Sequence, residues 1–356
     1  MYAQADKNID LSIIKMPLKY LIPSIVFTIA AIFLMTSTVV ASLSNSSQAV
    51  LLRNSLIAST GRYPQDFNWD PAHIPAGFLV DKVNVPDDFS LIVSSIITTK
   101  VGVESGFNKA RIIEEHLTRK QQHEGYVSSD ISKTYHTIMT EGQGDCADYT
   151  LVFTGIALAA GIPVRKWGMA FNGFGSGHAF TEIYDRDLGK WVFFDIYNSM
   201  YVTNATTGIP LSAIEFQSLL RKGEGKSGYL IKAIGAGRFG FESVEDAQKY
   251  YIKGSDQFFL WWGNDVFKYD RIDLKVSKII GSGYLGRSIE QAIGLVMGVF
   301  PKIRLVKTDT NAAQIDALYN VRNMFLLSVC LLPVFLYLLF LELRLLLLFH
   351  RKKIQR

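Results

Sequence analysis

Cysteine is almost absent from this chain, which has two such residues in 356. Cys330 lies inside a long apolar run, where its expected role is that of a small apolar filler. Cys146 is then the single cysteine in the rest of the sequence, so no intrachain disulfide is available there. A domain outside the apolar run must be stabilised by core burial, and any thiol chemistry it performs must use Cys146.

Close-spaced metal ligands and basic clusters are also missing. The sequence contains neither a Cys-x-x-Cys pair nor a His-Glu-x-x-His pair, the spacings typical of zinc sites. Its basic residues do not form runs interleaved with aromatics, and the net charge of +5 is modest. We therefore expect no metal ion, no cofactor and no nucleic-acid partner.

Two apolar runs are long enough to cross a membrane. Residues 21–40 carry no charge, and residues 324–341 form a second run that continues beyond Glu342 and Arg344, whose side chains could reach the membrane interface. Basic residues precede the first run and follow the second, so the positive-inside rule places both termini in the cytoplasm. Residues 43–320 would then lie outside the plasma (inner) membrane. These basic residues are Lys7, Lys15, Lys19, Arg351, Lys352, Lys353 and Arg356.

The first run could instead be a cleaved signal peptide, since Val39-Val40-Ala41 offers small residues at a cleavage point. A retained anchor is favoured because the run is longer than most signal sequences, and either alternative leaves the central region outside. The sequence thus divides into a cytoplasmic N-terminus (1–20), a transmembrane helix (21–42), a stalk and irregular lead-in (43–90), a core domain (91–220), an extracytoplasmic extension (221–320), a second transmembrane helix (321–349) and a basic cytoplasmic tail (350–356).

The core domain begins its clearest pattern at Cys146. Residues 146–160 predict a buried helix, because they are nearly all apolar and end at Gly161 with a proline two residues beyond. Asp145 occupies the N-cap position and Asp148 follows three residues later, a pair that stabilises the start of a helix. The Cys146 side chain is therefore expected at the N-terminus of a buried helix.

Strand-like runs follow this helix, and the last two of them predict a hairpin. A turn centred just after Asp187 pairs Tyr184 with Trp191. His178 then becomes a diagonal neighbour of Asp195 on the same face of the sheet, whereas a slip of one residue would send the two side chains to opposite faces. The three runs are residues 164–171, 178–184 and 191–197.

Other segments are patterned less clearly. Ordered secondary structure is expected to begin near Leu91, after a proline-containing region. The aromatic run 258–262 is expected in the core, and the glycine-rich residues 172–177 are either a flexible lip over Cys146 or an ordinary connection. Further helices are expected at residues 108–122, 211–220 and 244–252.

The order of Cys146, His178 and Asp195 is typical of acyl chemistry on a nucleophilic cysteine. A helix N-terminus and a neighbouring imidazolium both lower the pKa of a thiol, and a carboxylate can fix the tautomer of the imidazole. The Cys146 amide, or more weakly Gln143, could stabilise an oxyanion. The alternatives are that these residues are merely buried, or that Cys146, His178 and Asp195 bind zinc.

This constellation resembles the transglutaminase-like superfamily, also called the transglutaminase core, from about residue 108 to about residue 220. The resemblance implies an α+β, papain-like fold in which the cysteine helix packs on an antiparallel sheet and Cys146, His178 and Asp195 form the triad. Calcium sites and extra β-domains of animal transglutaminases have no visible equivalent, so protein cross-linking is not favoured. The residues that carry the resemblance are Gly144-Asp145-Cys146-Ala147-Asp148-Tyr149, Gly161-Ile162-Pro163-Val164-Arg165, Gly177-His178-Ala179-Phe180-Thr181-Glu182-Ile183, Trp191 and Asp195.

The sequence therefore predicts a membrane-anchored cysteine enzyme of the cell envelope that hydrolyses amides or esters, or transfers their acyl groups. The alternative is an inactive scaffold of an envelope or exopolysaccharide system, because membrane-anchored bacterial members with a similar two-span layout often look like accessory proteins of such systems. The expected partners are the lipid bilayer and a protein or glycan-linked amide in the envelope, with polysaccharide machinery as a further candidate.

Overall fold

The computed structural model describes residues 18–42, 44–59, 67–80, 85–97, 105–120, 125, 127, 130–233, 241, 243–264, 266–267, 293–295, 297–298 and 300–354. The predicted cytoplasmic N-terminus falls almost entirely outside these residues. The chain forms two compact units, one made of Met1–Ser44 with Arg322–Arg356 and the other of Asn45–Val321.

The first unit consists of α1 (Leu18–Ser42) and the greater part of α12 (Ala312–Ile354). Both helices are long and apolar enough to cross a membrane. Ser24 and Thr28 of α1 donate hydrogen bonds to the carboxylate of Glu342 in α12, at 2.5 Å and 3.2 Å. Glu342 was expected to reach the membrane interface, but hydroxyl groups of the neighbouring helix bind it instead, a common way to satisfy a polar group between apolar helices.

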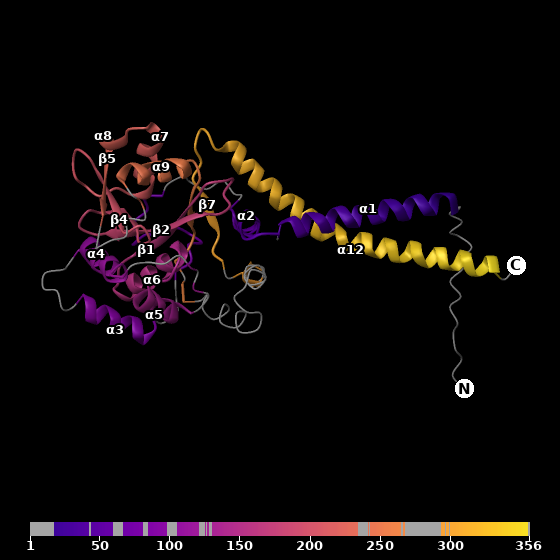
Figure 1. Ribbon diagram of the computed structural model, residues 1–356, viewed down its shortest axis with the longest axis horizontal. Helices are drawn as coiled ribbons and strands as arrows, with labels where there is room; N and C mark the ends of the chain where they lie inside the picture. The colour runs from indigo at the N-terminus through magenta and orange to yellow at the C-terminus, as the bar shows by residue number, and fades with distance from the viewer. Residues whose placement is uncertain are drawn as a thin grey trace. The chain divides into compact units, whose positions relative to one another are not determined.

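The second unit is built on a seven-stranded sheet with the order β5-β4-β3-β2-β1-β6-β7, in which every pair is antiparallel. Helices and this sheet together confirm the predicted α+β class, and Figure 1 shows helices on both faces of the sheet. The strands are β1 (Val164–Ala170), β2 (Gly177–Asp185), β3 (Lys190–Asp195), β4 (Met200–Asn204), β5 (Tyr229–Ala233), β6 (Phe258–Trp261) and β7 (Ile303–Leu305).

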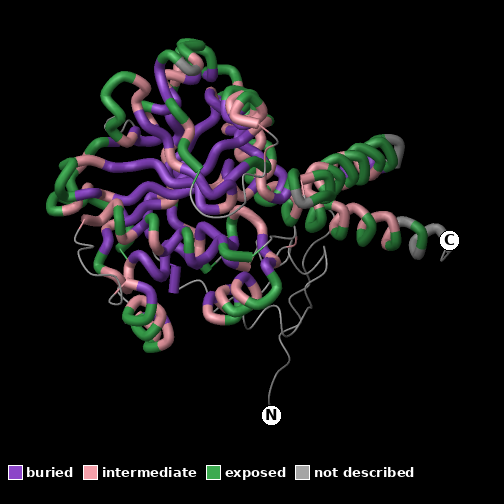
Figure 2. The backbone as a smooth tube through the Cα atoms, turned by 60° about the vertical axis from the view of Figure 1, so that its left-hand side comes forward, coloured by how far each residue is buried: buried purple, intermediate pink, exposed green. Residues whose placement is uncertain are grey.

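The strands divide their side chains between two cores because alternate residues point to opposite faces. Ile183, Val192 and Phe194 pack with one set of helices, while Phe180 and Phe193 pack with the other. In Figure 2 the central strands are buried along most of their length. The first set of helices is α3 (Asp87–Ile96), α4 (Gly106–Leu117), α5 (Ile131–Glu141) and α6 (Cys146–Ala159), and the second is α7 (Ala213–Lys222) and α9 (Val244–Gly254). The short helix α8 (Gly225–Gly228) contacts α7 and β5.

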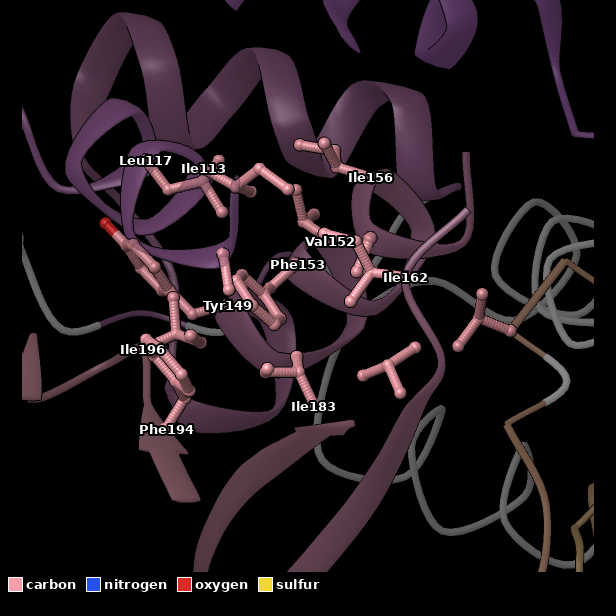
Figure 3. Packing of buried hydrophobic residues seen from close by; sticks show 14 of the residues in the cluster. Ile113, Leu117, Tyr149, Val152, Phe153, Ile156, Ile162, Ile183, Phe194 and Ile196 are labelled. Atoms are coloured by element: carbon pink, nitrogen blue, oxygen red, sulfur yellow. The ribbon is translucent and has the colours of Figure 1, made fainter. Parts of the chain in front are cut away.

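Helix α6 confirms the predicted cysteine helix. Asp145 Oδ1 accepts hydrogen bonds from the amides of Ala147 (2.9 Å) and Asp148 (3.0 Å), and Asp148 Oδ2 accepts one from the Asp145 amide (3.0 Å). This capping box fixes the first residue of the helix. Gly161 ends it with a φ of +68°, which glycine adopts without strain. Figure 3 shows the apolar side chains of α6, from Tyr149 to Ile156, packed among residues of α4 and the sheet.

The predicted stalk is wrong for its first part. Residues Ser46–Ile57 form α2, whose N-cap Asn45 accepts a hydrogen bond from the Gln48 amide at 2.9 Å. Phe67 and Phe78 are buried in the second core, so ordered structure begins well before Leu91. The segment was interpreted as a stalk because it is rich in serine and asparagine, but it forms a helix whose apolar residues are buried against the domain.

The boundary expected at residue 221 does not separate two parts of the molecule. Strands β5, β6 and β7, from the predicted extension, belong to the same sheet as β1–β4. Strand β6 pairs directly with β1, with Gly168 opposite Phe259. The aromatic run 258–262 is largely buried and forms this strand, which confirms its predicted place in the core.

Candidate active site

Cys146 is the first residue of α6 and is half-buried. It lines a cavity of about 360 Å³ between α6, the ends of β1 and β2, and α2. This volume lies within the range of small-ligand sites. Gly177 and His178 line the same cavity, so a molecule bound there can contact the sulfur and the imidazole together.

The hairpin register predicted from the sequence is confirmed. Tyr184 pairs with Trp191, and the pairing continues to Thr181 opposite Phe194. His178 and Asp195 consequently face each other, with Nε2 of the ring 2.5 Å from Oδ2 of the carboxylate. Both side chains are buried, since their exposed fractions are 2% and 0%.

The other side of the His178 ring faces the thiol. The Cys146 side chain is close enough to help raise the pKa of His178, and because Nε2 is bound to Asp195, Nδ1 is the nitrogen left for sulfur. Burial by itself would lower the pKa of His178, but the Asp195 carboxylate and the Cys146 side chain raise it to about 10. The structure thus bonds His178 to Asp195 and places Cys146 and His178 on the wall of the same cavity.

Two further residues, which sequence reasoning missed, hold the Asp195 carboxylate. The Asn198 backbone amide donates to Oδ1 at 3.0 Å, and its side-chain amide donates to Oδ2 at 2.9 Å. The Tyr251 hydroxyl of α9 also donates to Oδ2 and accepts from Asn198 at 3.1 Å. Burial would raise the pKa of Asp195, yet His178, Tyr251 and Asn198 together hold it below its usual value.

The position of Asn198 gave a weak signal in the sequence, since an aspartate side chain often closes a turn by accepting from a backbone amide a few residues further on. Tyr251 gave no such signal in the sequence, because it lies 56 residues from Asp195 along the chain.

A second buried carboxyl group, that of Glu114 in α4, lies near this network. Burial raises its pKa most, and the charge of Asp195 raises it further. Burial thus disfavours the charged form of Glu114, whereas the pKa of Asp195 is lowered, so Asp195 is the carboxylate that pairs with His178.

Tyr251→Phe is expected to lower the free energy of unfolding by about 1–3 kcal/mol, because the Asp195 carboxylate and the Asn198 amide each lose a buried partner. Chemical denaturation of the full chain in detergent would measure the change. Tyr250→Phe is the matched control, since no hydrogen bond to its hydroxyl is seen within the described residues. Equal losses in the two variants would contradict a specific role for the Tyr251 hydroxyl.

Gln143, the weaker oxyanion candidate, is not among the residues that line the cavity. Its side chain lies against Gly125, where an added Cβ would come within 3.1 Å of Gln143 Cγ. The Ala147 and Asp148 amides are engaged by Asp145, whereas the Cys146 amide, at the first helical position, has no acceptor within the helix. The geometry therefore favours the Cys146 amide over Gln143.

The glycine-rich segment 172–177 forms part of the cavity wall and is anchored by hydrogen bonds, which favours the second of the two alternatives, a connection between strands, over a flexible lip. The Phe174 carbonyl accepts a hydrogen bond from the Asn54 side chain at 2.7 Å, and the Phe174 amide donates to Gln257 Oε1 at 2.9 Å. Phe174 is fully buried with a φ of +64°, a conformation that these two bonds hold in place. At Gly177 a Cβ would collide with the Met169 carbonyl, so glycine permits the close approach of β1 that positions His178.

Comparison with known families agrees with this geometry. Residues 96–196 match the model of the transglutaminase-like superfamily, so the chain contains a transglutaminase-like domain. The match confirms the resemblance seen in the sequence, although it starts before residue 108 and stops before residue 220. No curated protein and no solved structure matches the chain significantly. Asn198, Tyr251 and α2 lie outside the matched segment.

Proposed function

We propose that this transglutaminase-like domain is a cysteine-dependent acyl enzyme in which Cys146 attacks an amide or ester carbonyl. The observation that supports it most directly is the hydrogen bond between His178 and Asp195 beside a cavity that Cys146 and His178 both line. Each member has the neighbour that its role requires: a nucleophile beside an imidazole, and an imidazole oriented by a carboxylate.

The steps follow from the positions of the protons. With His178 protonated, the Cys146 thiolate attacks the carbonyl carbon, and the oxyanion is stabilised by the amide at the start of α6. His178 then gives its proton to the departing amine or alcohol, which leaves a thioester on Cys146. Water or an amine attacks the thioester, its proton passes to His178, and the acyl product leaves as the thiolate is restored.

Hydrolysis is the favoured fate of the thioester. Transfer to an amine requires a site that binds the amine and excludes water, whereas the half-buried Cys146 opens onto a cavity that water can enter.

The residues that hold Asp195 support an active enzyme over an inactive scaffold. Four hydrogen bonds converge on this one buried carboxylate, from His178, from both donors of Asn198 and from Tyr251, and a relic would not need to keep such a network satisfied.

We further propose that α1 and α12 anchor the enzyme in the plasma membrane with both termini in the cytoplasm, so that the domain acts in the cell envelope. The support is the length and apolarity of the two helices and the basic residues at both ends of the chain. The substrate would then be a protein or glycan-linked amide outside the membrane.

The rate at which N-ethylmaleimide labels Cys146 tests the activated thiol. His178→Ala is expected to slow labelling at pH 7 by about tenfold or more, because the imidazolium that favours the thiolate is removed. The full chain would be used in detergent with Cys330→Ala, and mass spectrometry would quantify the Cys146 peptide.

His136→Ala is the matched control for this experiment, since His136 is exposed on α5, and it should leave the rate unchanged. Equal labelling of native and unfolded protein, with no effect of His178→Ala, would rule out the proposed nucleophile. Mass spectrometry of an acyl group trapped on Cys146 from an envelope extract would then identify the substrate class.

A further inference from the structure

Part of the wall of the cavity that Cys146 lines is built by residues outside the transglutaminase-like match. Val50, Arg53 and Asn54 of α2 line the cavity together with Trp261 of β6 and Phe300. Helix α2 was expected to be part of a stalk, yet it contributes the guanidinium group of Arg53 to the space in which a substrate of Cys146 must lie. The identity of that substrate is therefore constrained by α2 as well as by the triad.

The Arg53 guanidinium is held in one orientation. Its Nε and Nη2 donate to Asn54 Oδ1 at 3.1 Å and 2.9 Å, and its Cζ lies 5.2 Å from the ring centre of Trp261 and 5.6 Å from that of Phe300. Asn54 is itself fixed, since it is fully buried and donates to the Phe174 carbonyl. A guanidinium that is stacked and oriented in advance loses little entropy when it binds a planar anion.

The acidic residues on the cavity wall are already engaged by the start of α6. Asp145 accepts hydrogen bonds from the Ala147 and Asp148 amides, and Asp148 accepts from the amides of Asp145 and Val127. These carboxylates are therefore satisfied by amides and by the positive end of the helix dipole. Arg53 and Lys166 line the same cavity and, together with the charged His178 ring, give it a positive side.

We infer that Arg53 binds a carboxylate of the acyl substrate, so that the preferred substrates are acidic amides or esters, such as peptides with a free carboxylate near the bond that is cleaved. This inference rests on the proposed cysteine chemistry, because the same cavity must hold the reacting carbonyl beside Cys146. Arginine suits this role because its planar group carries five N–H donors, of which Arg53 uses two to bind Asn54, and such a group binds carboxylates strongly.

Two thiol probes of similar size test the inference on the full chain carrying Cys330→Ala. N-ethylmaleimide is neutral, and 3-maleimidopropionate carries a carboxylate. Arg53→Gln is expected to lower the rate of Cys146 labelling by the anionic probe about tenfold, the scale of one charge-assisted hydrogen bond, and to leave the neutral probe within about twofold. Arg53→Lys should show an intermediate loss, because an ammonium group lacks the planar arrangement of donors.

Arg304→Gln is the control with the same change of charge, since Arg304 on β7 stacks on Trp262 and is not part of the cavity wall. It should leave both rates unchanged. The inference is overturned if the anionic probe is unaffected by Arg53→Gln, or if Arg304→Gln has the same effect, which would indicate only the general field of the protein.

A fall in both rates with Arg53→Gln would indicate a damaged site, and Arg53→Lys then decides the matter. If Arg53→Lys slows labelling by the anionic probe but not by the neutral probe, the inference is supported. If Arg53→Lys changes the two labelling rates by the same factor, the inference is overturned. Failure of the proposed function is a different result, in which the neutral probe labels Cys146 at a rate that does not depend on His178.

Discussion

Asp195→Asn is expected to slow acylation of Cys146 at pH 7 by about 10⁴-fold, the loss seen when the carboxylate of a Ser-His-Asp triad is replaced by an amide. The reason is that Asp195 determines whether the His178 ring keeps its proton. The Asp195 carboxylate accepts the hydrogen bond from His178 Nε2 and stabilises the charged ring, whereas an amide does neither with the same strength. Release of p-nitrophenol from p-nitrophenyl acetate, measured in a single turnover, would report the rate.

The dependence of the acylation rate on pH should also change in Asp195→Asn. The pKa of His178 is raised to about 10, so the charged ring persists through neutral pH, and reactions that need it should decline as pH rises through about 10. The charged ring also stabilises the folded protein. This contribution is complete below pH 6.5, the ordinary pKa of histidine, and is lost as the pH rises from there through about 10. In Asp195→Asn the carboxylate that raises the pKa of His178 is gone, and burial of the ring lowers that pKa. The decline in reaction rate and the decline in stability should therefore both occur at lower pH than in the wild type.

Asp187→Asn is the control for Asp195→Asn, because Asp187 lies exposed in the hairpin turn and its replacement makes the same change in net charge. It should leave the rate and the pH profile as in the wild type. A wild-type rate in Asp195→Asn, with an unchanged profile, would mean that the observed contact between His178 and Asp195 does not control the charge of the ring.

The parts of this site that could be predicted from the sequence are local ones. The caps of α6 lie within a few residues of Cys146, and the hairpin that joins His178 to Asp195 is fixed by a short turn and by alternation of apolar residues. Local spacing determines these contacts, and the sequence displays local spacing directly. The three residues of the triad could therefore be predicted from the sequence alone.

The parts that could not be predicted depend on pairing between distant segments. Strand β6 lies beside β1 although about 90 residues separate them, and Tyr251 reaches Asp195 only because α9 packs on the face of the sheet where Asp195 lies. Arg53 was missed for the same reason, since α2 contacts the cavity through the loop at Phe174. Antiparallel neighbours without a short turn leave no periodic signal.

The stability of the same sheet depends on a buried ion pair next to the triad strands. Arg165 of β1 and Glu182 of β2 are both fully buried, with Arg165 Nε and Nη2 each 2.6 Å from Glu182 Oε2. The indole of Trp167 also donates to Oε2, and the Ala213 amide at the start of α7 donates to Oε1 at 2.6 Å. The guanidinium stacks 4.0 Å from the ring centre of Trp191. Glu182 thus joins β1, β2 and α7 through one carboxylate.

Glu182→Gln is expected to lower the free energy of unfolding by about 3–5 kcal/mol, because the buried charge of Arg165 loses its counter-ion and one oxygen acceptor becomes an N–H donor. Guanidinium denaturation of the full chain in detergent, followed by tryptophan fluorescence, would measure it. Glu215→Gln is the matched control: its ion pair with Lys190 is partly exposed, and glutamine can keep its bond to the Ser212 amide, so we expect a loss of about 1 kcal/mol or less. If the two variants lose similar amounts, the Arg165–Glu182 pair contributes no more than a surface pair, and the junction of β1, β2 and α7 must be held by apolar packing alone.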